Sequence, residues 1–310
     1  MKALFVTTKT NDMPNYVESF SCLGNEVEQY TFDHMAGTEP SGETLDAEIY
    51  SKAKAYSPDL LVYIGACQCK TPSPQIFARL KAEGIPTVHL CPDAESESWW
   101  PELLEFNRHD SFTVQVGMDG GAEWPLKGKG LAMLMAFDPA RYPEPPKGHA
   151  LRNYVFGFAG NAGGMSRLSD GRVVGRRAYT AAMQKFGLKV KPRNEVPDSY
   201  QEVADFNSEC RMIPNFGETG SYDRMHVKWR VIEAGMGASM LLEPAGSPTS
   251  NWFEPNVDYL EWTSILHLEK LVKRLRNRPD ETQGFGDRLR AKVQANHLPK
   301  KFWATVLGRV

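Results

Sequence analysis

A glycine-rich segment near the middle of the chain has the composition of an anion-binding loop. The run Phe158-Ala159-Gly160-Asn161-Ala162-Gly163-Gly164 follows an apolar stretch, and a helical pattern containing Arg176 comes after it. Glycine lets the backbone approach a ligand closely, and the N-terminus of a following helix adds partial positive charge. The spacing differs from the dinucleotide fingerprint and from the P-loop, so an ordinary turn is an equal alternative. Gly160, Asn161 and Arg176 are the candidate binding residues.

Two basic residues, Lys228 and Arg230, begin a second helical pattern within His226–Gly235. The helix dipole disfavours positive charge in a first turn, which makes sense if both residues face an anion. A diphosphate would fit, since lysine supplies a point charge and arginine a bidentate fork. Glu233 lies three residues after Arg230 and could accept hydrogen bonds from ribose hydroxyls. The alternative is a solvated helix face with a weak Arg–Glu ion pair.

A loop of small and hydroxyl-bearing residues follows the apolar run 238–243. It contains Ser247 and Thr249, and Glu254 comes shortly after it. Open α/β sheets bind ligands at the carboxyl ends of their strands. The loop is therefore a candidate contact for phosphate or sugar, with a plain strand–helix connection as the alternative.

Acidic residues follow the apolar runs of the first half of the chain. Asp12 and Asp93 are the candidate catalytic residues, and Asp119 lies in a similar place. A carboxylate at a strand end can act as general base on an acceptor hydroxyl. Aspartate is also common in loops and N-caps, so each has a structural alternative. His89 and His109 are better explained as core or surface histidines.

Residues 270–303 are rich in lysine and arginine, with Phe285, Phe302 and Trp303 interleaved. A solvated helix face explains this composition. The alternative is a surface for a polyanion such as DNA, or for lipid headgroups. The basic residues are Lys270, Lys273, Arg274, Arg276, Arg278, Arg288, Arg290, Lys292, Lys300 and Lys301.

The elements that must position these residues alternate between strands and helices, which predicts mainly parallel sheets covered on both faces. In the first half we expect strands at 2–8, 26–32, 59–65, 86–91, 111–116 and 130–135, and helices at 16–23, 44–56 and 74–83. In the second half we expect strands at 153–159, 188–191, 210–214, 238–243 and 257–262, and helices at 171–186, 200–207, 227–236 and 264–276.

A group of prolines at positions 139, 143, 145 and 146 separates the two halves and predicts a linker. We therefore expect an N-terminal domain over 1–148, linker included, and a C-terminal domain over 149–310, whose last helix could pack back on the first domain. The fold class expected is α/β, with two Rossmann-like doubly wound domains facing across a cleft.

The composition is that of a globular protein, with 41% hydrophobic and 24% charged residues and a net charge of −2. No window reaches the length of a membrane span, and the N-terminus is typical of a buried strand and not of a signal peptide. The five cysteines contain no Cys-x-x-Cys pair. A disulfide framework or structural zinc site is therefore not expected, and a cytoplasmic location fits best.

The order of the motifs resembles a known family. Arg230–Ala238 and Trp252–Tyr259 together resemble the C-terminal signature of the CgeB-like (spore-maturation-type) glycosyltransferases, and more distantly that of retaining GT-B transferases of the glycogen-synthase type. Phe158–Gly160 is similar to the loop that opens the second domain in that group. In the first domain, Pro58–Val62 and Val88–Asp93 look like the family's mid-sheet strands. The resemblance is good over 153–275 and loose before that.

That resemblance implies a GT-B hexosyl- or pentosyltransferase. The donor would be a nucleotide sugar, most often a UDP-sugar, held by Arg230 and Lys228 at the diphosphate and by Glu233 at the ribose. Such enzymes usually need no metal or further cofactor. Retaining members often carry a second glutamate eight positions before Glu233, where this chain has Met225. The stereochemical outcome is therefore open.

Three alternatives remain at this level. The acceptor is unidentified, and modified DNA bases would suit the late basic residues. A two-lobed nucleotide or sugar binder without catalysis would explain the same motifs. A sugar-nucleotide epimerase of the same architecture would process the donor with no acceptor present.

Overall fold

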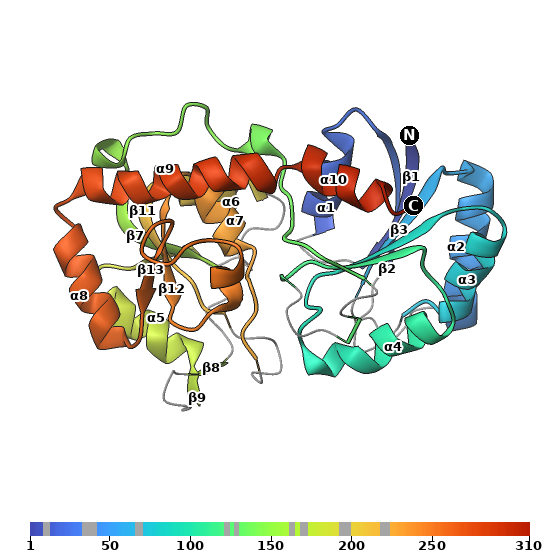
Figure 1. Cartoon of the computed structure of the whole chain (residues 1–310), viewed down its shortest axis with the longest axis horizontal. Helices are drawn as coiled ribbons and strands as arrows, with labels where there is room; N and C mark the ends of the chain where they lie inside the picture. Colours follow the sequence, from blue (N-terminus) through green and yellow to red (C-terminus); the bar gives the residue numbers. More distant parts are fainter. Residues whose placement is uncertain are drawn as a thin grey trace. The chain divides into compact units, whose positions relative to one another are not determined.

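The computed structural model describes the chain except for residues 9–12, 33–41, 66–70, 121–124, 127–129, 161–164, 168–172, 192–199 and 218–223. Its contacts divide into a first unit, Met1–Ala136 with Pro299–Val310, and a second unit, Phe137–Leu298. Each unit is built on its own parallel sheet (Figure 1). The expected fold class, two doubly wound α/β domains, is confirmed. By its contacts, the proline-rich segment belongs to the second unit.

The first unit has a six-stranded sheet in the order β2-β1-β3-β4-β5-β6, and every pair is parallel. Its strands are β1 (Lys2–Thr8), β2 (Glu26–Phe32), β3 (Leu60–Ile64), β4 (Thr87–Cys91), β5 (Val114–Gly117) and β6 (Leu131–Ala132). Its helices are α1 (Met13–Ser21), α2 (Gly42–Tyr56), α3 (Pro74–Ala82), η1 (Glu97–Trp99), α4 (Trp100–Arg108) and α10 (Pro299–Leu307).

Alternate residues of β1 fill the two faces of this sheet, as the period of a strand requires. Leu4 and Val6 pack in a core shared with α2, α3 and α4. Phe5 faces the other way, and its ring contacts those of Phe20 in α1 and Trp303 in α10 at centroid distances of 5.7 and 6.1 Å. The last helix of the chain thereby completes the core of the first unit.

The second unit has a five-stranded parallel sheet in the order β10-β7-β11-β12-β13 and a separate antiparallel hairpin, β8-β9. Its strands are β7 (Tyr154–Ala159), β8 (Met165–Arg167), β9 (Val173–Gly175), β10 (Lys189–Lys191), β11 (Cys210–Pro214), β12 (Met240–Pro244) and β13 (Leu260–Trp262). Its helices are η2 (Pro139–Arg141), η3 (His149–Leu151), α5 (Arg176–Gln184), α6 (Tyr200–Ser208), α7 (Arg230–Met236), η5 (Pro248–Asn251), α8 (Ile265–Leu275) and α9 (Pro279–Asn296).

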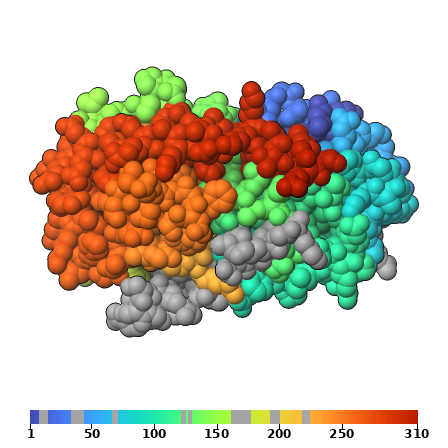
Figure 2. Space-filling model, in the orientation of Figure 1, coloured from blue at the N-terminus to red at the C-terminus, as the bar shows by residue number. Residues whose placement is uncertain are grey.

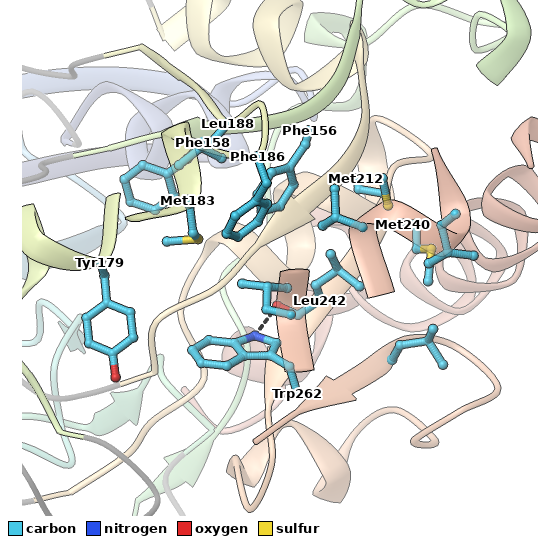
Figure 3. Packing of buried hydrophobic residues seen from close by; sticks show 14 of the residues in the cluster. Phe156, Phe158, Tyr179, Met183, Phe186, Leu188, Met212, Met240, Leu242 and Trp262 are labelled. Atoms are coloured by element: carbon cyan, nitrogen blue, oxygen red, sulfur yellow. Dashed lines mark hydrogen bonds between the residues drawn. The ribbon is translucent and has the colours of Figure 1, made fainter. Parts of the chain in front are cut away.

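The main apolar core of the second unit lies between the sheet and the helices α5 and α8 (Figure 3). Phe156, Met212 and Leu242 come from three adjacent strands, and Tyr179 and Met183 come from α5. The indole of Trp262 donates a hydrogen bond to the Leu242 carbonyl at 3.1 Å, so its one polar atom is satisfied inside the core. No described helix is both long enough and apolar enough to cross a membrane.

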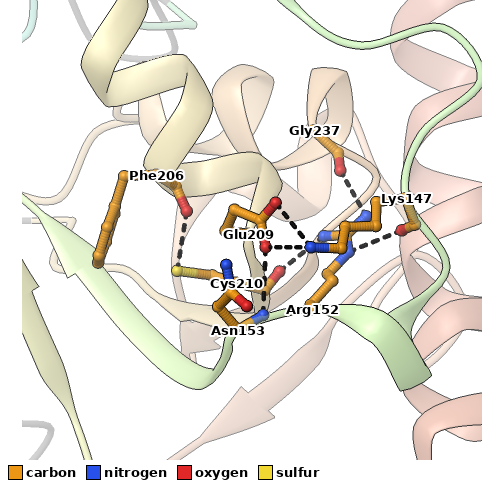
Figure 4. A network of polar contacts seen from close by, with 7 residues as sticks. All are labelled: Lys147, Arg152, Asn153, Phe206, Glu209, Cys210 and Gly237. Carbon is orange, nitrogen blue, oxygen red and sulfur yellow. Dashed lines mark hydrogen bonds and ion pairs between the residues drawn. The ribbon is translucent and has the colours of Figure 1, made fainter.

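A buried arginine fixes the amino-terminal edge of this sheet (Figure 4). Arg152, 4% exposed, donates hydrogen bonds to the carbonyls of Lys147, Cys210 and Gly237 at 2.9, 2.6 and 2.8 Å, and to the Ser239 hydroxyl at 2.8 Å. These groups lie just before or at the start of β7, β11 and β12. The guanidinium therefore ties together the beginnings of the three strands that lead to the opposite edge.

One expected element is wrong. Residues 171–186 were expected to form a single helix, but Val173–Gly175 is strand β9 and pairs with Met165–Arg167, so the helix begins only at Arg176. The two valines are β-branched and favour the extended conformation, which the pairing with β8 then fixes. The helix expected at 227–236 is likewise shorter and begins at Arg230.

Trp303→Ala is expected to lower the free energy of unfolding of the first unit by about 3–5 kcal/mol, because it empties a large buried site. The side chain is 1% exposed, and its Nε1 donates to the Ser19 hydroxyl at 3.0 Å. Urea unfolding followed by circular dichroism measures the change. Lys300→Ala, on the exposed side of the same helix, is the control. Equal stabilities of the two variants would show that α10 is not part of this core.

Candidate functional site

The carboxyl ends of β7, β11 and β12 bring three polar groups of the second unit together. Ala159 ends β7, Asn215 follows β11, and Glu243 is the next-to-last residue of β12. The Asn215 backbone N–H donates to the Leu242 carbonyl at 2.9 Å, so the pairing of β11 with β12 continues to this point. This is the sheet edge where α/β folds bind ligands.

Arg230, the first residue of α7, lies over this edge and is partly exposed. Its guanidinium donates to the Asn215 side-chain oxygen at 3.1 Å and to the Ala159 carbonyl at 2.7 Å. The same group lies 4.2 Å from the centre of the Phe158 ring, a cation–π contact. Three contacts from two strands thus hold one positive charge in a defined orientation, as recognition of a phosphate requires.

Gly160 provides the space for that guanidinium. A Cβ built on Gly160 would lie 2.5 Å from an Arg230 terminal nitrogen, closer than any real contact. A larger residue at this position would therefore displace the end of the Arg230 side chain, a role of the glycine that the composition of the loop alone did not reveal. The next residue of the loop, Asn161, lies outside the described residues.

Asn215 connects Arg230 to a buried carboxyl group. Its side-chain nitrogen donates to Glu243 Oε1 at 3.1 Å, while its oxygen accepts from Arg230. Both Asn215 and Glu243 are fully buried. The orientation of the amide is consequently fixed at both ends, and the three side chains form one continuous hydrogen-bonded chain.

Glu243 is the most perturbed acid of this edge. The hydroxyls of Ser247 and Thr249 also donate to its Oε1, at 2.6 and 2.9 Å. Burial raises its pKa from the ordinary value of 4.5 to about 7, while the hydrogen bonds from Ser247, Asn215 and Thr249 and the charge of Arg230 act in the opposite direction. Near neutral pH, this group therefore exchanges between its acid and carboxylate forms.

The predicted loop residues lie at the expected edge, but their side chains have other partners. Ser247 and Thr249 are 1% and 0% exposed, and both hydroxyls are directed to Glu243. Glu254 is exposed, and its backbone N–H donates to Asp258 at 2.7 Å. The structure brings Ser247 and Thr249 to the Arg230 chain through Glu243 and does not bring Glu254 to it.

Glu233 lies on α7, three residues after Arg230, but is 1% exposed. Its carboxylate accepts a hydrogen bond from the Tyr200 hydroxyl and lies 3.5 Å from the side-chain nitrogen of Asn207, both on α6. In this structure Glu233 links α7 to α6. Its predicted contact with a ribose stays a prediction. Lys228 is partly exposed and precedes the helix.

Other predicted residues are placed only in part. Asp12 lies outside the described residues. Arg176 is the first residue of α5, and the structure describes its backbone only. Asp93 follows β4 in the first unit and is partly exposed, and its carbonyl accepts from the Ser96 N–H at 3.0 Å.

His89 and Asp119 of the first unit are buried, and both have hydrogen-bond partners within the protein. His89 is stacked among the rings of Tyr63 and Phe112, and one of its ring nitrogens lies 2.8 Å from the Gly65 carbonyl. Burial lowers its pKa to about 4, which keeps the ring neutral. Asp119 is buried, and its Oδ2 accepts from the Glu95 backbone N–H at 2.9 Å.

The late basic residues are largely paired within the chain. The helices α8 and α9 lie at the molecular surface (Figure 2). Their cations form ion pairs or donate to carbonyls in these combinations: Lys273 with Glu269, Arg274 and Arg278 with Glu281, Lys292 with Asp258, Arg290 with Glu144, Arg276 with the Phe186 carbonyl and Arg288 with the Val257 carbonyl. The interleaved aromatics Phe285, Phe302 and Trp303 are buried. The arrangement corresponds to a solvated helix face.

The sequence did not single out Asn215 or the acid of Glu243 as parts of the site. Each follows or ends a buried apolar run, which is the signal that could have identified them. The partner of each is distant in sequence, however, and only the order of strands in the sheet makes them neighbours.

Glu243→Gln is expected to stabilise the protein above neutral pH. A carboxyl with a raised pKa costs folding free energy once it ionises, so the penalty is absent below pH about 4.5, grows as the pH rises and is complete above pH about 7. The difference between variant and parent should approach roughly 3 kcal/mol at pH 8 and be small at pH 5, by the value of one pKa unit. Urea unfolding at both pH values measures it.

The matched control for this measurement is Glu254→Gln, which changes an exposed glutamate of the same unit. It should alter the free energy of unfolding by less than about 0.5 kcal/mol at either pH. A Glu243→Gln effect that does not grow between pH 5 and pH 8 would contradict the raised pKa.

Comparisons with known proteins agree with this architecture. Residues 161–308 match the family described as glycosyl transferase-like. Sucrose-phosphate synthase from Thermosynechococcus elongatus has a similar fold, with 12% identity, a TM-score of 0.65 and coverage of 100% of this chain and 98% of that one. HepE from Anabaena in complex with UDP and glucose is similar at 13% identity and a TM-score of 0.62 over 100% of both chains.

A third solved structure, UDP-GlcNAc 2-epimerase from Neisseria meningitidis bound to UDP-GlcNAc, matches with 8% identity and a TM-score of 0.57, over 99% of this chain and 100% of that one. No curated protein matches the chain in sequence. At these identities the solved structures show the fold alone. The chain has the GT-B fold, and its residues 161–308 match the glycosyl transferase-like family.

Proposed function

We propose that the protein is a glycosyltransferase that transfers a sugar from a nucleotide donor to an acceptor. The observation that carries the proposal is the guanidinium of Arg230, held at the carboxyl edge of the second sheet by Asn215, the Ala159 carbonyl and the Phe158 ring. A partly exposed and oriented arginine at this edge suits a diphosphate. The match of residues 161–308 to the glycosyl transferase-like family supports the same assignment.

The donor we propose is a UDP-sugar, because HepE and the Neisseria epimerase, which share the fold, were solved with UDP or a UDP-sugar. Arg230, with Lys228, would contact the diphosphate, and the backbone of the Gly160 loop and of the loop at Ser247 would approach it. We also assign the chain to the CgeB-like branch, on the motifs Arg230–Ala238 and Trp252–Tyr259. Transfer would proceed without a metal or a further cofactor.

The first unit would bind the acceptor, with Asp93 as general base. The acceptor itself is open. DNA stays one candidate, although the ion pairs of α8 and α9 reduce the positive charge that a polyanion would meet. The epimerase and the non-catalytic binder differ from the proposal in a measurable way. An epimerase changes the donor sugar without an acceptor, and a binder leaves it unchanged.

Calorimetric titration with UDP, ADP, GDP, CDP and dTDP tests the donor site. We expect one or two of them to bind. Arg230→Ala should then weaken binding by about 2–4 kcal/mol, roughly 30- to 1,000-fold, because it removes charge-assisted hydrogen bonds to the diphosphate. Gly160→Ala keeps the charge but displaces the guanidinium, and should weaken binding in the same direction.

Arg274→Ala is the matched control, since it removes an exposed arginine that pairs with Glu281 on the same unit. Its affinity should equal that of the parent protein. Failure of all five nucleotides to bind, or equal loss in Arg274→Ala and Arg230→Ala, would refute the proposed donor site.

Asp93→Asn is expected to spare donor binding and to lower transfer at least 100-fold, since general-base catalysis typically contributes 10²–10⁴-fold. Transfer of labelled sugar to a set of candidate acceptors measures the rate, and calorimetry measures the affinity. Asp110→Asn, an exposed aspartate of the same unit, is the control. Unchanged transfer by Asp93→Asn would exclude it as the base.

A further inference from the structure

The two carboxyl oxygens of Glu243 have unequal surroundings. Oε1 accepts three hydrogen bonds, from Ser247, Thr249 and Asn215. Oε2 is equally buried and has no hydrogen-bond partner among the residues that the structure describes. An ionised carboxylate would leave a lone, charged oxygen inside the protein, which is costly. A proton on Oε2 removes that charge and leaves all three hydrogen bonds to Oε1 intact.

Glu243 is connected to the partly exposed Arg230 through the side-chain amide of Asn215. Asn215 can accept from Arg230 only with its oxygen and donate to Glu243 only with its nitrogen, so its orientation is fixed by both partners. The hydrogen-bonded chain thus connects a group that can change charge to a guanidinium that is partly exposed. No change of backbone position is needed for one end to affect the other.

We propose that Glu243 is a positioning residue, which holds Arg230 in place through Asn215, and that binding of a nucleoside diphosphate at Arg230 is accompanied by proton uptake at Glu243. The inference rests on the proposed function in one respect, that a diphosphate binds at Arg230. The protons and charges balance as follows: the diphosphate anion binds at Arg230, a proton from solvent binds to Glu243, and the buried carboxylate becomes a neutral acid. Arg230 keeps its charge and gains an external anion in place of an internal one.

The direction of the coupling follows from charge. Without ligand, burial places the pKa of Glu243 at about 7, with the positive charge of Arg230 favouring the ionised form. A bound diphosphate neutralises that charge and adds negative charge nearby, so it raises the pKa of Glu243 further. By linkage, affinity is constant well below pH 7, falls as the pH rises through the pKa of the free protein, and becomes constant again above that of the complex.

Titratable groups near Glu243 lie on several elements packed against it. Arg230 on α7 stays charged throughout. On the β13 side, Glu243 faces Tyr259, whose pKa is raised far above its usual value by burial and by the charges of Glu261, Glu243 and Asp258, so Tyr259 stays neutral. Glu261 is the register partner of Glu243 on β13.

His226 is buried in the segment before α7 and is a further titratable group near this edge in the described part of the chain. Ser247 and Thr249 in the loop after β12, and Asn215 after β11, do not titrate in this range. A variant in which the side chain at position 243 cannot ionise separates the proton uptake of Glu243 from that of His226 and of the ligand.

The test compares the parent protein with Glu243→Gln by titration calorimetry with UDP, or with whichever nucleoside diphosphate binds, in buffers of different ionisation enthalpy. For a pKa increase of one unit on binding, the parent should take up about half a proton per ligand at pH 7.5, and its affinity should fall about fivefold between pH 6 and pH 8. Titration of the nucleotide itself is common to both proteins and cancels in the difference. Glu243→Gln, an isostere of the neutral acid, should lack this uptake and bind at pH 8 about as tightly as at pH 6.

Two further variants complete the experiment. Glu261→Gln, the control on the neighbouring strand, should keep the proton uptake of the parent. Ser247→Ala removes a hydrogen bond that favours the ionised form of Glu243, so the pH of maximal uptake should move upward. This second variant keeps the test valid if Glu243→Gln does not fold.

The outcomes separate the two proposals. Binding by the parent with equal proton uptake in Glu243→Gln, or an unchanged uptake profile in Ser247→Ala, overturns the role of Glu243 and leaves the donor site standing. A folded Glu243→Gln variant that binds no nucleotide also overturns it, because the neutral form would then be incompetent. Absence of nucleotide binding in the parent overturns both.

Discussion

The second unit depends on the satisfaction of buried polar groups at the two edges of one parallel sheet. At the amino edge, Arg152 donates to carbonyls around the starts of β7, β11 and β12 and so fixes how these strands align. At the carboxyl edge, Ala159 and Asn215 both accept hydrogen bonds from Arg230, and Asn215 in turn donates to Glu243. In a parallel sheet all amino ends of the strands lie at one edge and all carboxyl ends at the other. Contacts that align the strands at the amino edge therefore also set which residues are neighbours at the carboxyl edge.

The two arginines show how the same residue type serves structure and chemistry. Arg152 is 4% exposed, and its donors are directed to main-chain carbonyls and a hydroxyl, so it has little capacity for a ligand. Arg230 is partly exposed at the carboxyl edge of the sheet. Burial lowers the pKa of Arg152 to about 10, which shows the cost of such a charge inside the protein. Both are arginines close to a buried strand, and sequence context alone does not separate them.

The sequence predicted most strands because buried strands have continuous apolar runs with clear ends; β1, β2 and β11 begin and end where they were expected. It also located the sheet edge and Arg230. What it missed depends on contacts between distant residues. The hydroxyls of Ser247 and Thr249 donate to Glu243, and Glu233 accepts from Tyr200. The contact of this loop with phosphate or sugar and that of Glu233 with a ribose stay predictions. Residue type predicts hydrogen-bonding capacity, whereas the partner is chosen by the tertiary fold.

The return of the chain to the first unit has a consequence for the order of events during synthesis. Phe5 and Phe20 are translated before the second unit, yet the indole of Trp303 that covers them is translated after it. The second unit, continuous in sequence, can complete its core first. The N-terminal part must wait with an apolar face uncovered, so it is the part of the nascent chain on which we expect a chaperone to act.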